Sequence, residues 1–206
     1  LSWREWPPEV RDRHAGALTR LRRDLGLDIL FRQYLQWIAQ TQWQTARADA
    51  RAAGVSVYGD FPFGVAADSA DTWAHQDLFS FDGSVGAPPD DFSEDGQNWA
   101  LPMYRWEVLA ARDYAWFRER ARRIADLMDG FRVDHVVGLF RSWIFDLDGQ
   151  PTGFVPGEES EQITQGTAVL RALIGRATVI AEDLGTIPDF VRETLQGLGI
   201  PGYKVL

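Results

Sequence analysis

The 206-residue sequence contains no cysteine, which excludes disulfides and thiolate metal sites. Its three histidines, His14, His75 and His135, are too scattered for a metal-ligand motif, and we expect neither a metal nor a cofactor. No apolar run approaches the roughly 20 residues of a membrane span. Acidic residues outnumber basic ones by 30 to 21, and the net charge of -9 argues against nucleic acid and anionic membranes as partners. We therefore expect a cytoplasmic globular protein.

What the sequence does contain is a large apolar and aromatic fraction. Hydrophobic residues make up 45% of the chain, which is enough for a packed core, and the length predicts one domain over residues 1–206. Nine tryptophans serve either as core residues or as platforms for sugar rings. The chain starts at Leu1 and stops within an apolar run at residues 205–206. We expect it to be the central part of a larger protein, and its oligomeric state cannot be inferred.

Two short apolar stretches, residues 131–135 and 178–182, have the composition of strands with charged groups at their ends. Because side chains alternate along a strand, Arg132 and Asp134 share one face, and the cation favours an ionised, nucleophilic carboxylate. If the strands are parallel neighbours, Asp134 and Glu182 emerge at one edge as a pair suited to glycoside chemistry. Alternatively, Arg132 and Asp134 form a structural ion pair and Glu182 caps a helix.

The order of the expected elements predicts the fold class. Alternating helices and strands favour an α/β fold with a parallel sheet and right-handed crossovers, and long loops after strands favour a barrel. About four strands fit, whereas a complete barrel takes ~250 residues, so we expect a partial (β/α)8 TIM-type barrel. Helices are expected at residues 11–26, 30–53, 104–128 and 167–174, and a loop with a helix at 185–198. Strands are expected at 55–60, 131–134, 178–182 and 203–206, and loops at 61–103 and 140–165.

The expected loop at residues 61–103 is too long for an ordinary connection, and loops of this length are usually functional or disordered. Its many aromatic residues, among them Phe92 and Trp99, argue against disorder. We therefore expect it to bind substrate.

Four blocks of the sequence resemble the amylomaltase family, the 4-α-glucanotransferases. The block with GxPPDxFSxxGQxW is the most specific, whereas the RxDH block alone is shared in outline with α-amylase relatives. The blocks are GDFPFGVAADSADTWAHQDLF (residues 59–79), GAPPDDFSEDGQNWALPMYRWE (86–107), FRVDHVVGLFRSW (131–143) and VIAEDLGTIPDFV (179–191).

This resemblance implies a retaining mechanism on α-1,4-glucans in an eightfold barrel. By position, Asp134 would be the nucleophile and Glu182 the general acid and base. Arg132 would hold Asp134 ionised, Asp60 would bind the reacting sugar, and His135 would contact a sugar hydroxyl. The implied partners are a maltodextrin donor and a sugar acceptor.

Gln97 and Trp99 would lie on the loop that arches over the glucan, although packing within that loop is an equally open role. Two residues depart from the family pattern, since Gly64 and Leu101 stand where many members have Tyr and Asn. A third catalytic Asp of the family would follow the last strand, beyond this chain, so we expect little turnover from these 206 residues alone. A catalytically silent or glucan-binding fragment and an α-amylase-type hydrolase are the alternatives.

Overall fold

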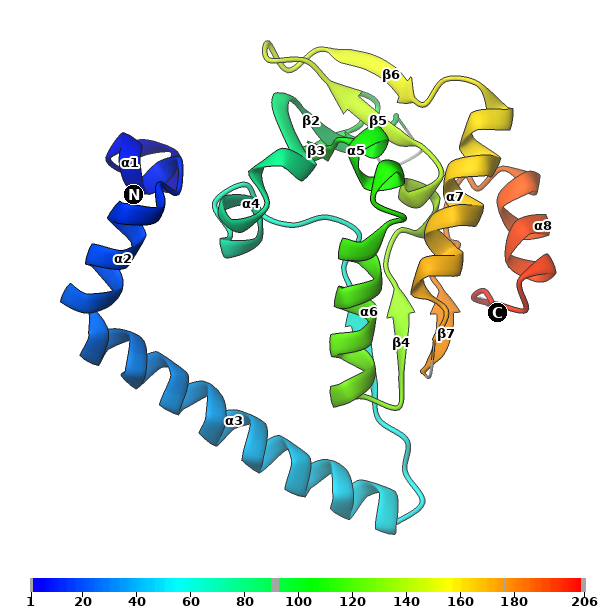
Figure 1. Cartoon of the computed structure of the whole chain (residues 1–206). Coiled ribbons are helices and arrows are strands. Elements are labelled where there is room, and N and C mark those ends of the chain that lie inside the picture. Colours follow the sequence, from blue (N-terminus) through cyan, green and yellow to red (C-terminus); the bar gives the residue numbers. More distant parts are fainter. Residues whose placement is uncertain (1, 90–92, 176, 205–206) are drawn as a thin grey trace. The chain divides into compact units, whose positions relative to one another are not determined.

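The computed structural model describes residues 2–89, 93–175 and 177–204, which form two compact units, Leu1–Ser56 and Val57–Leu206 (Figure 1). The first unit is helical. Its longest helix ends as expected, because Gly54 adopts a left-handed φ of 75° and its N–H donates to the Arg51 carbonyl. Its elements are a 3-10 turn, η1 (Trp3–Glu5), and the helices α1 (Pro8–Arg11), α2 (Ala15–Asp24) and α3 (Gly26–Ala52).

The second unit contains a parallel sheet with strand order β1-β4-β7 within the described residues. Its strands are β1 (Tyr58–Phe61), β4 (Gly130–Val133) and β7 (Thr178–Ala181). The expected strands at residues 131–134 and 178–182 are confirmed, and the one expected at 55–60 begins three residues later. Residues 203–204 are not in a strand, and residues 205–206 of the last expected strand lie outside the described residues.

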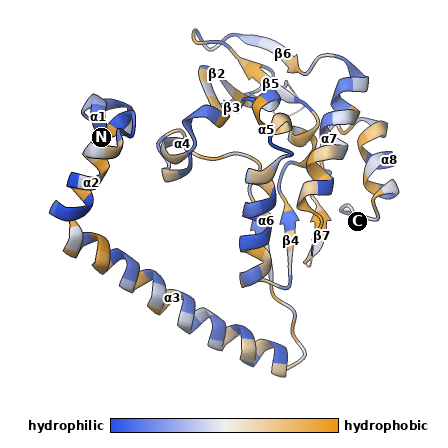
Figure 2. Ribbon diagram, in the orientation of Figure 1, coloured by the Kyte–Doolittle hydropathy of each residue, from blue (hydrophilic) through white to orange (hydrophobic). Residues whose placement is uncertain are grey.

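Helices cover one face of this sheet. Helix α6 (Ala115–Leu127) packs on β1 and β4, and α7 (Glu159–Leu173) packs beside it. Phe61, Phe131 and Val133 point into this layer and are buried. Phe61 contacts the ring of Phe131 at 5.7 Å between centroids. Figure 2 shows the matching alternation of hydrophilic and hydrophobic residues along α6.

Two segments that were expected to be loops form a second, antiparallel sheet. In the described residues its order is β3-β2-β5-β6, so residues 61–103 and 140–165 contain strands. Irregular strands hid this sheet, since the β2–β3 pairing shifts register at Val85, and β3 includes Pro102 and a left-handed Ala100. The strands are β2 (Phe79–Ala87), β3 (Gln97–Tyr104), β5 (Ser142–Phe145) and β6 (Pro151–Val155).

The helix expected over residues 104–128 is broken in the middle. Asp113 and Tyr114 both adopt φ of 51°, which ends one helix and starts the next at a new angle. The helix expected at 167–174 begins earlier, at Glu159. The remaining elements are α4 (Ala70–Ala74), η2 (Gln76–Leu78), α5 (Trp106–Ala111), η3 (Val136–Leu139) and α8 (Asp189–Gly197).

Gly130, the first residue of the central strand β4, has no space for a side chain, and this gives a test of the packing. A Cβ there would approach the ring of Tyr58 and lie 2.7 Å from the Thr178 carbonyl oxygen, whereas at Gly59 it would meet mainly the flexible Met128 side chain, 2.9 Å from its Cγ. We expect Gly130→Ala to lower the free energy of unfolding by about 1–3 kcal/mol and Gly59→Ala by less. Urea denaturation followed by circular dichroism measures both, and equal losses would contradict the packing.

Candidate functional site

The predicted site residues gather at the C-terminal edge of the parallel sheet. Asp60 pairs with Arg132 across β1 and β4, and Val133 pairs with Ala181 across β4 and β7. The ladder continues one residue further, because the Glu182 N–H donates to the Val133 carbonyl at 2.9 Å. Asp134 and Glu182 therefore leave neighbouring strands at the same level.

Arg132 connects two of the predicted carboxylates. Its Nε and Nη2 donate to the two oxygens of Asp60, both at 2.8 Å, and Nη2 also donates to Asp134 Oδ1 at 2.7 Å. The hydrogen bonding of the guanidinium to the Asp60 carboxylate is the main cause that raises the pKa of Arg132. The pair of Arg132 with Asp134 was expected from the shared strand face. The two hydrogen bonds from Arg132 to Asp60, a residue 72 positions earlier in the chain, were not expected from the sequence.

Backbone amides hold the Glu182 carboxylate. The N–H of His135 donates to Oε2 at 2.8 Å, and the N–H of Leu184 donates to Oε1 at 3.2 Å. The next helix, α8, starts at Asp189 and has Pro188 before it, so Glu182 does not cap that helix. Because His135 directly follows Asp134, this contact ties the end of one strand to the acid of the next.

His135 lies between two aromatic residues in an uncommon backbone conformation. Its φ of 49° is left-handed, which aims its N–H at Glu182. Its ring meets Trp99 edge-on at 4.8 Å and Phe63 at 5.7 Å between centroids. Burial lowers the pKa of His135 to about 4, so the imidazole is uncharged at neutral pH.

Gln97 and Trp99, predicted on a loop, lie in strand β3. The Trp99 indole N–H donates to Gln97 Oε1 at 3.4 Å, and the indole ring packs on His135. Trp99 is thereby brought to the sheet edge that carries Glu182. Phe92, the other aromatic residue expected to shield the site, lies outside the described residues.

A cavity of about 250 Å³ adjoins this edge, and Trp99, His135 and Leu184 form part of its wall. The wall also includes Arg141, Trp143 and Phe154, which the sequence reasoning did not select, although Arg141 and Trp143 end the third family block.

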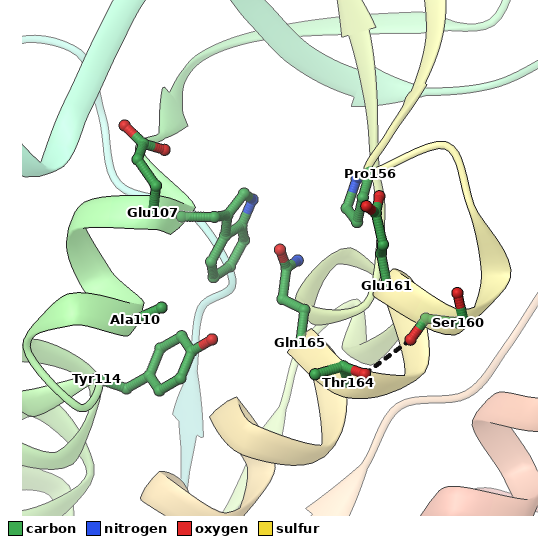
Figure 3. Close-up of a pocket in the computed structure, with 9 residues that line it drawn as sticks. Glu107, Ala110, Tyr114, Pro156, Ser160, Glu161, Thr164 and Gln165 are labelled. Atoms are coloured by element: carbon green, nitrogen blue, oxygen red, sulfur yellow. Dashed lines mark hydrogen bonds between the residues drawn. The ribbon is translucent and has the colours of Figure 1, made fainter.

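A larger hollow of about 540 Å³ lies elsewhere, beside α5 and α7 (Figure 3). In this close-up Tyr114 and Gln165 lie on opposite sides of the hollow, and Thr164 donates to the Ser160 carbonyl. None of the predicted site residues lines it.

Within residues 2–89, 93–175 and 177–204, histidine and acidic side chains form no group of three that could hold a metal ion. In the same residues, none of the helices is both long and apolar enough to cross a bilayer.

Comparisons with known proteins cover the entire chain. Residues 1–206 match the family model described as 4-alpha-glucanotransferase. The 4-alpha-glucanotransferase of Chlamydia pneumoniae is 39% identical over 203 residues, which are 97% of this chain and 38% of that protein. The Thermus thermophilus protein of the same name is 35% identical over 218 residues, covering 100% and 42%.

A solved structure agrees with these sequence matches. The amylomaltase from Streptococcus agalactiae, in complex with acarbose, superposes with a TM-score of 0.87 at 30% identity, covering 100% of this chain and 43% of that one. This match supports the expected α/β fold with a parallel sheet, of which the chain forms a part. The chain spans about two fifths of the length of these relatives.

The partly buried His135 gives a pH test of the site. Its ordinary pKa of 6.5 falls to about 4 in the folded chain, so between these values the unfolded chain binds a proton that the folded chain does not. The free energy of unfolding therefore decreases as pH falls from 6.5 to 4, by at most about 3 kcal/mol from this residue.

His135→Asn is the matched variant, because asparagine tolerates the left-handed backbone and does not titrate. Urea midpoints measured from pH 7 to pH 4 should fall less steeply in the variant than in the wild type. The same pH dependence of the urea midpoint in both proteins would contradict an imidazole that is uncharged in the folded chain.

Proposed function

Because the chain belongs to the 4-alpha-glucanotransferase family, we propose that the whole protein transfers α-1,4-glucan segments between maltodextrins by a retaining double displacement. The observation that carries this proposal is the placement of Asp134 and Glu182 on adjacent strand ends, with Arg132 bonded to Asp134. In the same proposal, residues 1–206 are part of one catalytic barrel domain. The donor is a maltodextrin and the acceptor is a second sugar chain.

The strand spacing supports a retaining rather than an inverting reaction. Retaining enzymes hold their two carboxyl groups ~5–5.5 Å apart, and neighbouring strands lie ~4.8 Å apart. Asp134 follows Val133, and Glu182 follows its register partner Ala181. In the proposed first step, Asp134 attacks the anomeric carbon while Glu182 protonates the departing glycosidic oxygen.

In the second step Glu182 takes a proton from the acceptor hydroxyl, which attacks the glycosyl-enzyme and frees Asp134. Arg132 orients Asp134, since its guanidinium is itself fixed by Asp60. Asp60 is half exposed beside the nucleophile, so it can also accept a hydrogen bond from a bound sugar.

The aromatic wall beside Glu182 favours transfer over hydrolysis. Trp99 and His135 pack together next to the amides that hold this carboxylate. An acceptor sugar can stack on such a surface, whereas excluding water from it slows the competing reaction. His135, Gln97 and Trp99 are accordingly proposed as sugar-binding residues.

The activity is tested by incubating the whole protein with maltotriose. We expect glucose together with longer maltodextrins, separated by chromatography. Release of reducing sugar without any product longer than maltotriose would indicate hydrolysis and contradict the transferase.

The two carboxylates are tested separately in the whole protein. Asp134→Asn and Glu182→Gln should each lower kcat for disproportionation by at least about 10³-fold, since each removes a group that reacts in the transition state. Asp126→Asn removes an exposed carboxylate on α6 and is the matched control. Retention of more than a tenth of the activity by either site variant would refute its assigned role.

A further inference from the structure

The cavity of about 250 Å³ carries an unusual distribution of charge. It lies between the β2–β3 and β5–β6 hairpins and the residues that follow β7, and among the described residues Arg141 is the one Lys, Arg, Asp or Glu side chain that lines it. In a chain with 30 acidic residues, a wall whose described residues include a cation and no carboxylate is not explained by average composition.

The guanidinium of Arg141 has no counter-ion in the described part of the chain. Its Cζ lies 3.8 Å from the centroid of the Phe154 ring, and its Nε is sealed from solvent without a hydrogen-bond acceptor. Burial lowers the pKa of Arg141, which is the expected cost of a cation in such surroundings. The terminal nitrogens are not sealed, so they remain available to an acceptor that enters the cavity.

The volume and the lining residues of the cavity indicate which class of ligand can supply that acceptor. An apolar cavity of ~150 Å³ holds benzene, so this larger one has room for a six-membered ring with substituents. Trp99 and Trp143 supply aromatic surface of the kind that contacts sugar rings. A guanidinium binds oxyanions through paired hydrogen bonds, whereas a neutral hydroxyl would leave its charge uncompensated.

We propose that this cavity binds a small phosphorylated sugar, with the phosphate on the terminal nitrogens of Arg141 and the ring against the tryptophans. Two residues of the same wall, His135 and Leu184, donate their N–H groups to the Glu182 carboxylate. Trp99 and His135 also form the surface proposed above for the acceptor sugar, so a bound sugar phosphate occupies that position and contacts the segments that position Glu182. This regulatory consequence rests on the proposed transferase function, but the binding itself does not.

The experiment is calorimetric titration of the chain with glucose 6-phosphate, inorganic phosphate and glucose. We expect glucose 6-phosphate to bind most tightly, inorganic phosphate more weakly, and glucose least. In Arg141→Met, which keeps the length and apolar stem of the side chain, the Kd for glucose 6-phosphate should rise about tenfold or more. Arg171→Met removes an exposed positive charge on α7 and should leave the Kd unchanged.

Circular dichroism checks that Arg141→Met is folded, and Arg141→Lys, which keeps the charge, should restore part of the affinity. Equal affinity for glucose and glucose 6-phosphate would show a neutral sugar subsite and overturn the proposal. So would the absence of binding in the wild-type chain, or the same Kd in Arg141→Met. Because binding is measured without turnover, these outcomes are independent of the maltotriose assay.

Discussion

One guanidinium fixes the geometry of the proposed catalytic edge. Arg132 bonds to both oxygens of Asp60 on one strand and to Asp134 beyond the end of its own. Exposed ion pairs contribute little stability, and this one is partly open to solvent. The network matters for orientation. Two hydrogen bonds to Asp60 fix the plane of the Arg132 guanidinium, and this guanidinium in turn donates a hydrogen bond to the proposed nucleophile Asp134.

This arrangement depends in turn on the register of the parallel sheet. Phe61, Phe131 and Val133 are buried beneath the helices, and a slip of one residue would turn them out to solvent. The same slip would carry Arg132 to the covered face. Burial of the apolar side chains thus determines where the charged ones meet, and the left-handed His135 completes the edge by aiming its amide at Glu182.

The features predictable from sequence are those that follow from strand alternation. Arg132, Asp134 and Glu182 could be placed on one edge because each lies in or directly after an apolar stretch. The antiparallel sheet could not be predicted, since its strands are bulged and interrupted by residues such as Pro102. The pairing of Asp60 with Arg132 and the position of Arg141 in the wall of its cavity arise from tertiary contacts that no local pattern encodes.

The assignment of Asp134 as nucleophile is the central claim, and trapping the covalent intermediate tests it most directly. The whole protein is incubated with a fluorinated glucosyl fluoride, whose ring fluorine slows breakdown of the glycosyl-enzyme, and then digested for mass spectrometry. The account predicts one glycosylated peptide with the sugar on Asp134. A sugar attached to Asp60 or Glu182 would contradict it.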